Sequence, residues 1–171
     1  DFRTNSKIAL EIIYDRYGLS EYYPLFDEYY RVYSEKNTEL WSLYHHNRIS
    51  KETLIVERFR YPLQRVGAYN DKLVLQLNAD YLSVLSEQGE LVPQARELLD
   101  YLKSRSYRLH IISNGFKEVQ FKKMKSAGIE SYFEKIILSD EVGVNKPHPD
   151  IFRYALNKTG SSKNTSLMIG D

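Results

Sequence analysis

The chain has 171 residues, of which 42% are hydrophobic and 27% charged, a composition typical of a globular protein rather than a disordered one. Its 24 Lys and Arg nearly balance 23 Asp and Glu, whereas a nucleic-acid binder normally carries a basic excess. The absence of Cys excludes disulfides, thiolate metal sites and a Cys nucleophile, and no apolar run reaches the roughly 18 residues that a membrane helix needs.

The first half of the chain, residues 1–88, is helical in pattern and aromatic. It holds 11 of the 15 Tyr, the only Trp and two of the eight Gly. Apolar residues recur at helical spacing in four stretches: 8–17, 25–33, 51–66 and 71–87. Ser50 is the expected N-cap of the third stretch. We predict four packed helices, in which most tyrosines lie between helices with their hydroxyls at the surface.

The second half, residues 89–171, has a different texture, with six of the eight Gly and three of the five Pro. Helical patterns there alternate with short apolar runs. The predicted order is helix 93–105, strand 109–112, helix 116–127, strand 136–138, helix 149–159 and strand 166–169. Strands that alternate with helices imply a parallel sheet with right-handed crossovers. We therefore predict an α/β core over 89–171, attached to a helical lobe over 1–88.

Polar residues follow each predicted strand, at the sheet edge where parallel sheets bind ligands. Ser113-Asn114-Gly115 follows the first strand, Asn145-Lys146 lies in the segment after the second, and Asp171 ends the third. Hydroxyl and backbone N–H groups at a helix start favour an anion, a Lys neutralises phosphoryl oxygens, and an Asp suits Mg²⁺. Taken one at a time, Ser113 also fits an ordinary turn and Lys146 a solvated loop. From the spacing alone, a phosphate site and a sheet edge without a ligand are therefore equally compatible with the sequence.

Three segments resemble the second, third and fourth motifs of the haloacid dehalogenase-like hydrolases. They are Ile111-Ile112-Ser113-Asn114-Gly115, the stretch Gly143-Val144-Asn145-Lys146-Pro147-His148-Pro149-Asp150-Ile151-Phe152, and Met168-Ile169-Gly170-Asp171. The resemblance implies a Rossmann-like three-layer α/β core with a parallel sheet and an inserted helical cap. It also implies that Ser113, with Asn114 and Gly115, binds the phosphoryl group, that Lys146 stabilises it, and that Asp171 holds Mg²⁺.

The first motif of that family, an Asp-x-Asp-x-Thr segment with the nucleophilic Asp, is absent from the sequence. We expect the nucleophile to lie upstream of Asp1, the chain to be truncated at both ends, and the first core strand to be missing. A fragment of this kind would neither fold well nor catalyse, because a missing central strand leaves buried backbone groups unpaired.

The helical half resembles the cap of the branch that dephosphorylates pyrimidine and noncanonical nucleoside monophosphates. The residues that carry this resemblance are Asn37-Thr38-Glu39-Leu40-Trp41, Ile49-Ser50 and Arg58-Phe59, with Asn114-Gly115-Phe116 in the core. The resemblance implies a Mg²⁺-dependent phosphomonoesterase, here a nucleoside 5'-monophosphate phosphatase, that works through an aspartyl-phosphate intermediate. It also implies a small phosphorylated partner, no nucleic acid or membrane, and a cytoplasmic location.

Two alternatives stay open at this point. A haloacid dehalogenase would share the fold and need no metal, although Gly170-Asp171 argues against it. A non-catalytic binding module or pseudoenzyme would gain weight if the gene lacked the upstream Asp pair. We expect the four histidines to be structural: His45 and His46 at a helix end, where they favour the helix dipole over a metal ion, His110 inside a strand and His148 in a loop.

Overall fold

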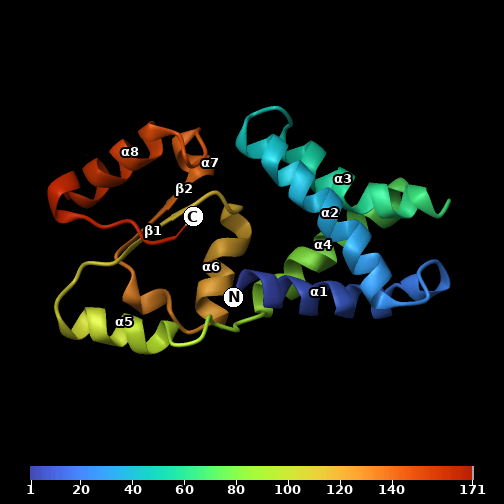
Figure 1. The fold of residues 1–171 in the computed structure, drawn as a ribbon, viewed down its shortest axis with the longest axis horizontal. Coiled ribbons are helices and arrows are strands. Elements are labelled where there is room, and N and C mark those ends of the chain that lie inside the picture. Colours follow the sequence, from blue (N-terminus) through green and yellow to red (C-terminus); the bar gives the residue numbers. More distant parts are fainter. Residues whose placement is uncertain (171) are drawn as a thin grey trace.

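The computed structural model describes residues 1–170 and shows a helical part and a strand-containing part joined through one helix (Figure 1). The helices are α1 (Phe2–Arg16), α2 (Phe26–His45), α3 (Lys51–Arg65), α4 (Asp71–Glu87), α5 (Ala95–Ser104), α6 (Lys117–Ser126), α7 (Ser139–Val142) and α8 (Pro149–Thr159). The strands are β1 (His110–Ser113) and β2 (Lys135–Leu138), and short 3₁₀ turns cover Leu19–Glu21, Glu130–Tyr132 and Lys163–Thr165. None of the helices described is both long and apolar enough to cross a membrane.

Helices α1 to α4 confirm the four predicted helical stretches, and side-chain caps fix the starts of α3 and α4. The Ser50 hydroxyl accepts a hydrogen bond from the backbone N–H of Thr53 at 3.2 Å, which fixes the start of α3. The Asn70 side chain does the same for α4 through the N–H of Leu73, at 3.1 Å. These caps satisfy backbone donors that would otherwise have no intrahelical partner.

The core of the helical part is built from aromatic rings. Tyr33 lies with its ring centroid 5.1 Å from Phe59 and 6.1 Å from Tyr81, and Tyr29 lies 6.2 Å from Tyr33. All four side chains are buried. The expectation that tyrosine hydroxyls reach the surface is therefore wrong for Tyr29, Tyr33 and Tyr81, because these residues face the middle of the bundle, where the Tyr81 hydroxyl pairs with Ser6 at 2.9 Å.

The two strands pair in parallel, as predicted for an α/β fold, with Ile111 opposite Ile136 and Ile112 opposite Ile137. The prediction of a third strand over 166–169 is wrong: these residues do not form a strand, and the side chains of Leu167 and Ile169 are 85% and 69% exposed. A strand forms by pairing its backbone with a neighbour. Within residues 1–170 the sheet contains β1 and β2 alone, so this segment has no partner.

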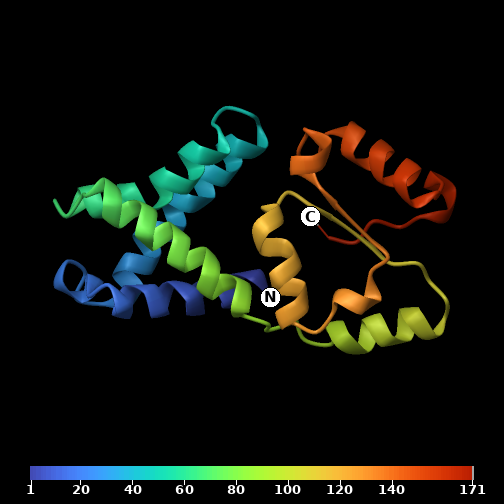
Figure 2. The same ribbon diagram turned by 180° about the vertical axis from the view of Figure 1, so that it is seen from behind.

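Helix α6 joins the two parts and lies between the strands and α1–α4 in both views (Figures 1 and 2). Its N-cap residue Phe116 and its Val119 belong to the same buried cluster as the helical bundle. The Ser126 hydroxyl at its other end donates to the backbone oxygen of Ser86 at 2.9 Å. A second, smaller cluster of Ile137, Ile151 and Ala155 packs α8 against β2. The predicted bounds of α6 and α8 are confirmed to within one residue, while the predicted 93–105 helix begins at Ala95.

Candidate active site

The two strands end at the same edge of the sheet, because they are parallel and in register. Ser113, the last residue of β1, pairs with Leu138, the last residue of β2. The chain leaves β1 through Asn114 and Gly115 into α6, and it leaves β2 directly into α7 (Figure 1). Ligands of open parallel sheets bind outside this edge, so the predicted site residues can be judged by whether they gather here.

The Asn114 side chain joins the two segments that carry the predicted phosphate-binding residues. Its Nδ2 donates to the backbone oxygen of Lys146 at 3.1 Å, and its Oδ1 accepts from the backbone N–H of Lys146 at 2.8 Å. The amide thus pairs with Lys146 as a neighbouring strand would, across 32 positions of sequence. The structure therefore places the Lys146 backbone beside the loop 113–115.

The loop 113–115 is tightly turned. The Ser113 hydroxyl accepts a hydrogen bond from the backbone N–H of Gly115 at 3.0 Å. A Cβ added to Gly115 would lie 1.8 Å from Nε2 of Gln120, so a side chain fits there only if Gln120 moves. The hydroxyl of Ser113 and the backbone N–H groups of the loop lie within three consecutive residues, the kind of donor cluster that suits a phosphoryl group.

Lys146 itself is partly buried and takes part in a further interaction besides its pairing with Asn114. The predicted metal ligand Asp171 lies outside the described residues. Over residues 1–170, no group of three His, Asp or Glu side chains is placed to hold a metal ion.

The C-terminal end of α2 reaches this edge from the helical part. The Asn145 side chain donates through Nδ2 to the backbone oxygen of Tyr44 at 3.3 Å. The Trp41 ring stacks on Phe116, with ring centroids 5.4 Å apart and an interplanar angle of 26°. Phe116 directly follows Gly115, so the helical part contacts the residues on either side of the candidate site.

Lys51, the first residue of α3, also reaches the edge, and the sequence analysis did not identify it. Its Nζ lies 3.3 Å from Asp140 Oδ2, 3.3 Å from Glu118 Oε2 and 4.5 Å from the centroid of the Phe116 ring. Burial alone would lower the pKa of Lys51, but the two carboxylates together raise it above its ordinary value. The only signal in the sequence was the N-cap at Ser50, which places Lys51 at a helix start but names no partner.

Two of the four histidines, His45 and His148, lie at helix ends near the candidate site segments. His45 ends α2 as predicted, and its ring lies 5.4 Å from Trp41. Burial first, and then the nearby His46 and Lys146, lower the pKa of His45. His148, predicted as a loop residue, caps α8 by accepting at Nδ1 from the backbone N–H of Asp150 at 3.3 Å.

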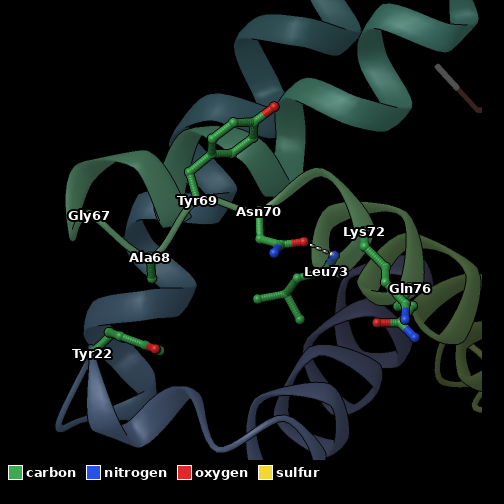
Figure 3. A pocket seen from close by; sticks show the side chains of 8 residues that line it. All are labelled: Tyr22, Gly67, Ala68, Tyr69, Asn70, Lys72, Leu73 and Gln76. Carbon is green, nitrogen blue, oxygen red and sulfur yellow. Dashed lines mark hydrogen bonds between the residues drawn. The ribbon is translucent and has the colours of Figure 1, made fainter.

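An open hollow of about 520 Å³ lies elsewhere, beside the turn between α3 and α4 (Figure 3). Its lining residues are Tyr22, Gly67, Ala68, Tyr69, Asn70, Lys72, Leu73 and Gln76. The Asn70 amide there is already used as the cap of α4, as the dashed line in Figure 3 shows. Since none of the predicted site residues lines this hollow, we do not assign it to the candidate site.

A family model for haloacid dehalogenase-like hydrolases matches residues 4–171. The chain is 31% identical over 145 residues to the pyrimidine 5'-nucleotidase YjjG of Escherichia coli, covering 84% of this chain and 62% of that protein. It is 28% identical to the pyrimidine 5'-nucleotidase PynA of Streptococcus pneumoniae, covering 100% of this chain and 70% of that protein.

Among solved structures, YfnB of Bacillus subtilis, described as a HAD-hydrolase bound to magnesium, superposes with a TM-score of 0.83 at 24% identity. The superposition covers 92% of this chain and 68% of that one. The likeness concerns the fold: a parallel sheet flanked by helices, with a helical lobe at its edge.

Proposed function

The chain belongs to the haloacid dehalogenase-like hydrolases, and from that membership we propose that the protein is a phosphomonoesterase acting on nucleoside 5'-monophosphates. The pairing of Asn114 with the Lys146 backbone carries the proposal, because it joins the two segments that we propose to bind the phosphoryl group. The pyrimidine 5'-nucleotidases among its relatives support the nucleoside class of substrate.

In the proposed site, the chain's own residues bind and orient the phosphoryl group. The Ser113 hydroxyl and the backbone N–H of Asn114 would donate to its oxygens, while the N–H of Gly115 donates to the Ser113 hydroxyl and fixes its position. The Lys146 ammonium would neutralise the negative charge that these oxygens gain in the transition state. Fixed donors in a site shielded from water do this with little reorganisation, which is where most of their catalytic effect originates.

The proposed reaction passes through an aspartyl phosphate. An Asp carboxylate forms a bond to phosphorus while the ester P–O bond breaks, and the departing nucleoside oxygen takes up a proton. Water then hydrolyses the acyl phosphate and releases inorganic phosphate. No residue of 1–171 occupies the family's Asp-x-Asp-x-Thr motif, so we propose that the nucleophile lies before Asp1. Mg²⁺, with Asp171 as a ligand, is the proposed cofactor.

We also propose that residues 1–88 form the cap and residues 89–171 part of the core. The contacts of Tyr44 with Asn145 and of Trp41 with Phe116 support this division, since they bring the helical part over the loops of the candidate site. A cap in this place excludes water from the reaction and selects the substrate.

The proposal is tested by phosphate release from a panel of pyrimidine nucleoside monophosphates, with the full gene product and Mg²⁺. Lys146→Ala is expected to lower kcat by roughly 100-fold or more, since one charge-stabilising donor contributes on that order. Lys163→Ala, an exposed lysine in the last 3₁₀ turn, is the matched control and should behave as wild type.

Full activity in Lys146→Ala, or phosphate release that survives chelation of the metal, would contradict the proposal. Release of halide from 2-haloacids in the presence of a chelator would instead support a dehalogenase, which needs no metal. Tight binding of nucleotides without any turnover would support a non-catalytic module.

A further inference from the structure

We propose that Lys51 is a positioning residue, which holds the starts of α6 and α7 against the helical part and thereby keeps the loop 113–115 in place. The proposal rests on the proposed function for its activity readout only. Its structural readout, described below, does not depend on which reaction the protein catalyses.

The argument begins with what the two carboxylate partners are attached to. Glu118 is the second residue of α6, which starts just after the loop 113–115, and Asp140 is the second residue of α7, which starts directly after β2. One ammonium at 3.3 Å from both therefore links the two chain segments that leave the two strand ends. Any displacement of α3 away from this edge breaks both links together.

The placement of these ion pairs in the molecule is distinctive. Within residues 1–170, two ion pairs join helices α1–α4 to residues of the strand-containing part, and Lys51 makes both of them. The others stay inside one part, as Lys7 with Asp27 does in the helical part and Arg108 with Glu134 in the strand-containing part. Lys51 is thus the charged connection between the helical part and the candidate site.

The two arms of this connection differ in strength. The side chains of Lys51 and Asp140 are 26% and 24% exposed, so their attraction is only partly screened by water. Glu118 is 72% exposed, and exposed pairs of that kind contribute little. The Phe116 ring, 4.5 Å from the ammonium, adds a cation–π contact on a buried side chain. Asp140 and Phe116 therefore carry most of the interaction.

Phe116 connects this contact to the loop itself. It follows Gly115 directly, it is 5% exposed, and Trp41 stacks on it from the helical part. Both Lys51 and Trp41 would leave Phe116 if the helical part moved off the edge. The position of the helical part and the geometry of the loop 113–115 are therefore coupled through one aromatic ring.

Trp41 offers a direct readout of that contact, because it is the only Trp of residues 1–171. Its signal is isolated by subtracting the emission of a Trp41→Phe variant of the full gene product. The test compares Lys51→Met, which keeps an unbranched side chain one atom shorter and removes the charge, with Lys51→Arg, which keeps the charge. Lys7→Met is the control, because Lys7 also pairs with a carboxylate at 3.3 Å and lies 5.1 Å from an aromatic ring, that of Tyr30.

In Lys51→Met we expect the population in which Trp41 is accessible to acrylamide to rise about fivefold, as removal of one partly buried ion pair allows. We expect kcat to fall roughly tenfold or more with a smaller change in KM, because a displaced binding loop loses transition-state contacts first. Lys51→Arg should restore both readouts to near wild type, and Lys7→Met should change neither.

Unchanged Trp41 quenching in a folded Lys51→Met variant would overturn the proposal, and so would a Lys7→Met variant with the same effect. If Lys51→Met fails to fold, the double variant Asp140→Asn, Glu118→Gln removes the same pairs from the other side and must show the same quenching. A protein without phosphatase activity in which Lys51→Met still exposes Trp41 would refute the proposed function while retaining this inference.

Discussion

At the scale of single residues, the Asn114 side-chain amide makes the pair of hydrogen bonds that a neighbouring strand makes elsewhere in a sheet. It supplies one donor and one acceptor to the Lys146 backbone, where no strand is present to do so. A part-buried N–H and C=O left without partners cost roughly 1–3 kcal/mol each. The Asn114 side chain therefore joins the Lys146 backbone to the loop 113–115, and a substitution there measures what this pairing contributes.

We predict that Asn114→Ala lowers kcat/KM for phosphate release by roughly 10- to 100-fold, since a displacement of about 1 Å at a catalytic group costs on the order of 100-fold. Asn114→Asp keeps the acceptor for the Lys146 N–H but loses the donor, so its kcat/KM should lie between those of wild type and Asn114→Ala. Asn157→Ala, at an exposed Asn in α8, is the control. Wild-type kcat/KM in Asn114→Ala would show that Lys146 does not depend on this pairing.

His110 in β1 makes the stability of the protein depend on pH. Both of its ring nitrogens are buried without hydrogen-bond partners. Burial is the largest cause that lowers the pKa of His110 below its ordinary 6.5; Arg108 and Lys135 act in the same direction, and Glu134 opposes them. Because the folded state holds the ring neutral, the unfolded state binds more protons as the pH falls below about 6.5. His110 therefore destabilises the fold progressively in that direction and has no such effect above it.

We predict that the urea midpoint of unfolding falls between pH 7.5 and pH 5.5, and that His110→Phe makes the fall smaller, because the ring shape is kept while the titrating group is removed. Some pH dependence should remain, since burial also lowers the pKa of His45. An equal fall in wild type and His110→Phe would show that protonation of His110 is not involved.

At the scale of elements, helices were predictable where the information is local. Ser50 and the apolar spacing after it lie within a few residues of one another, and the helix 51–66 was predicted to within one residue of α3. The strand 166–169 was not predictable, because an apolar run becomes a strand only when another strand lies beside it. Within the described residues the sheet consists of β1 and β2, and the run 166–169 pairs with neither of them.

In the candidate site, too, some features could be predicted from local sequence and others could not. The positions of Ser113 and Lys146 after strands follow from the alternating pattern, so their shared edge was predictable. The Asn114 pairing and the reach of Lys51 to Asp140 join residues 32 and 89 positions apart. Contacts at that separation depend on how elements far apart in the chain pack together, and no local pattern encodes them.

At the scale of the whole molecule, the helical part and the strand-containing part differ in how completely they are packed. The helical bundle holds most of the buried residues, whereas α5 has none, although its apolar residues line one face. On that helix Leu98 is 48% and Tyr101 54% exposed. Parallel sheets are normally covered by helices on both faces, and the chain spans 62% of the length of YjjG. An apolar helix face that nothing covers is expected to bind apolar ligands.

We therefore predict that a polypeptide of residues 1–171 binds the dye ANS with a marked rise in its fluorescence, and that the double variant Leu98→Lys, Tyr101→Lys removes most of that rise. The physical reason is that the two lysines place charges in the middle of the apolar face of α5, where a dye would otherwise displace water. Leu75→Lys is the matched control, because Leu75 is 58% exposed on α4 but lies on the well-packed helical bundle. Circular dichroism must show the same helix content in all three proteins. Dye fluorescence that survives in the double variant would place the exposed apolar surface away from α5, and the absence of any rise in the parent would mean that the face is covered in solution.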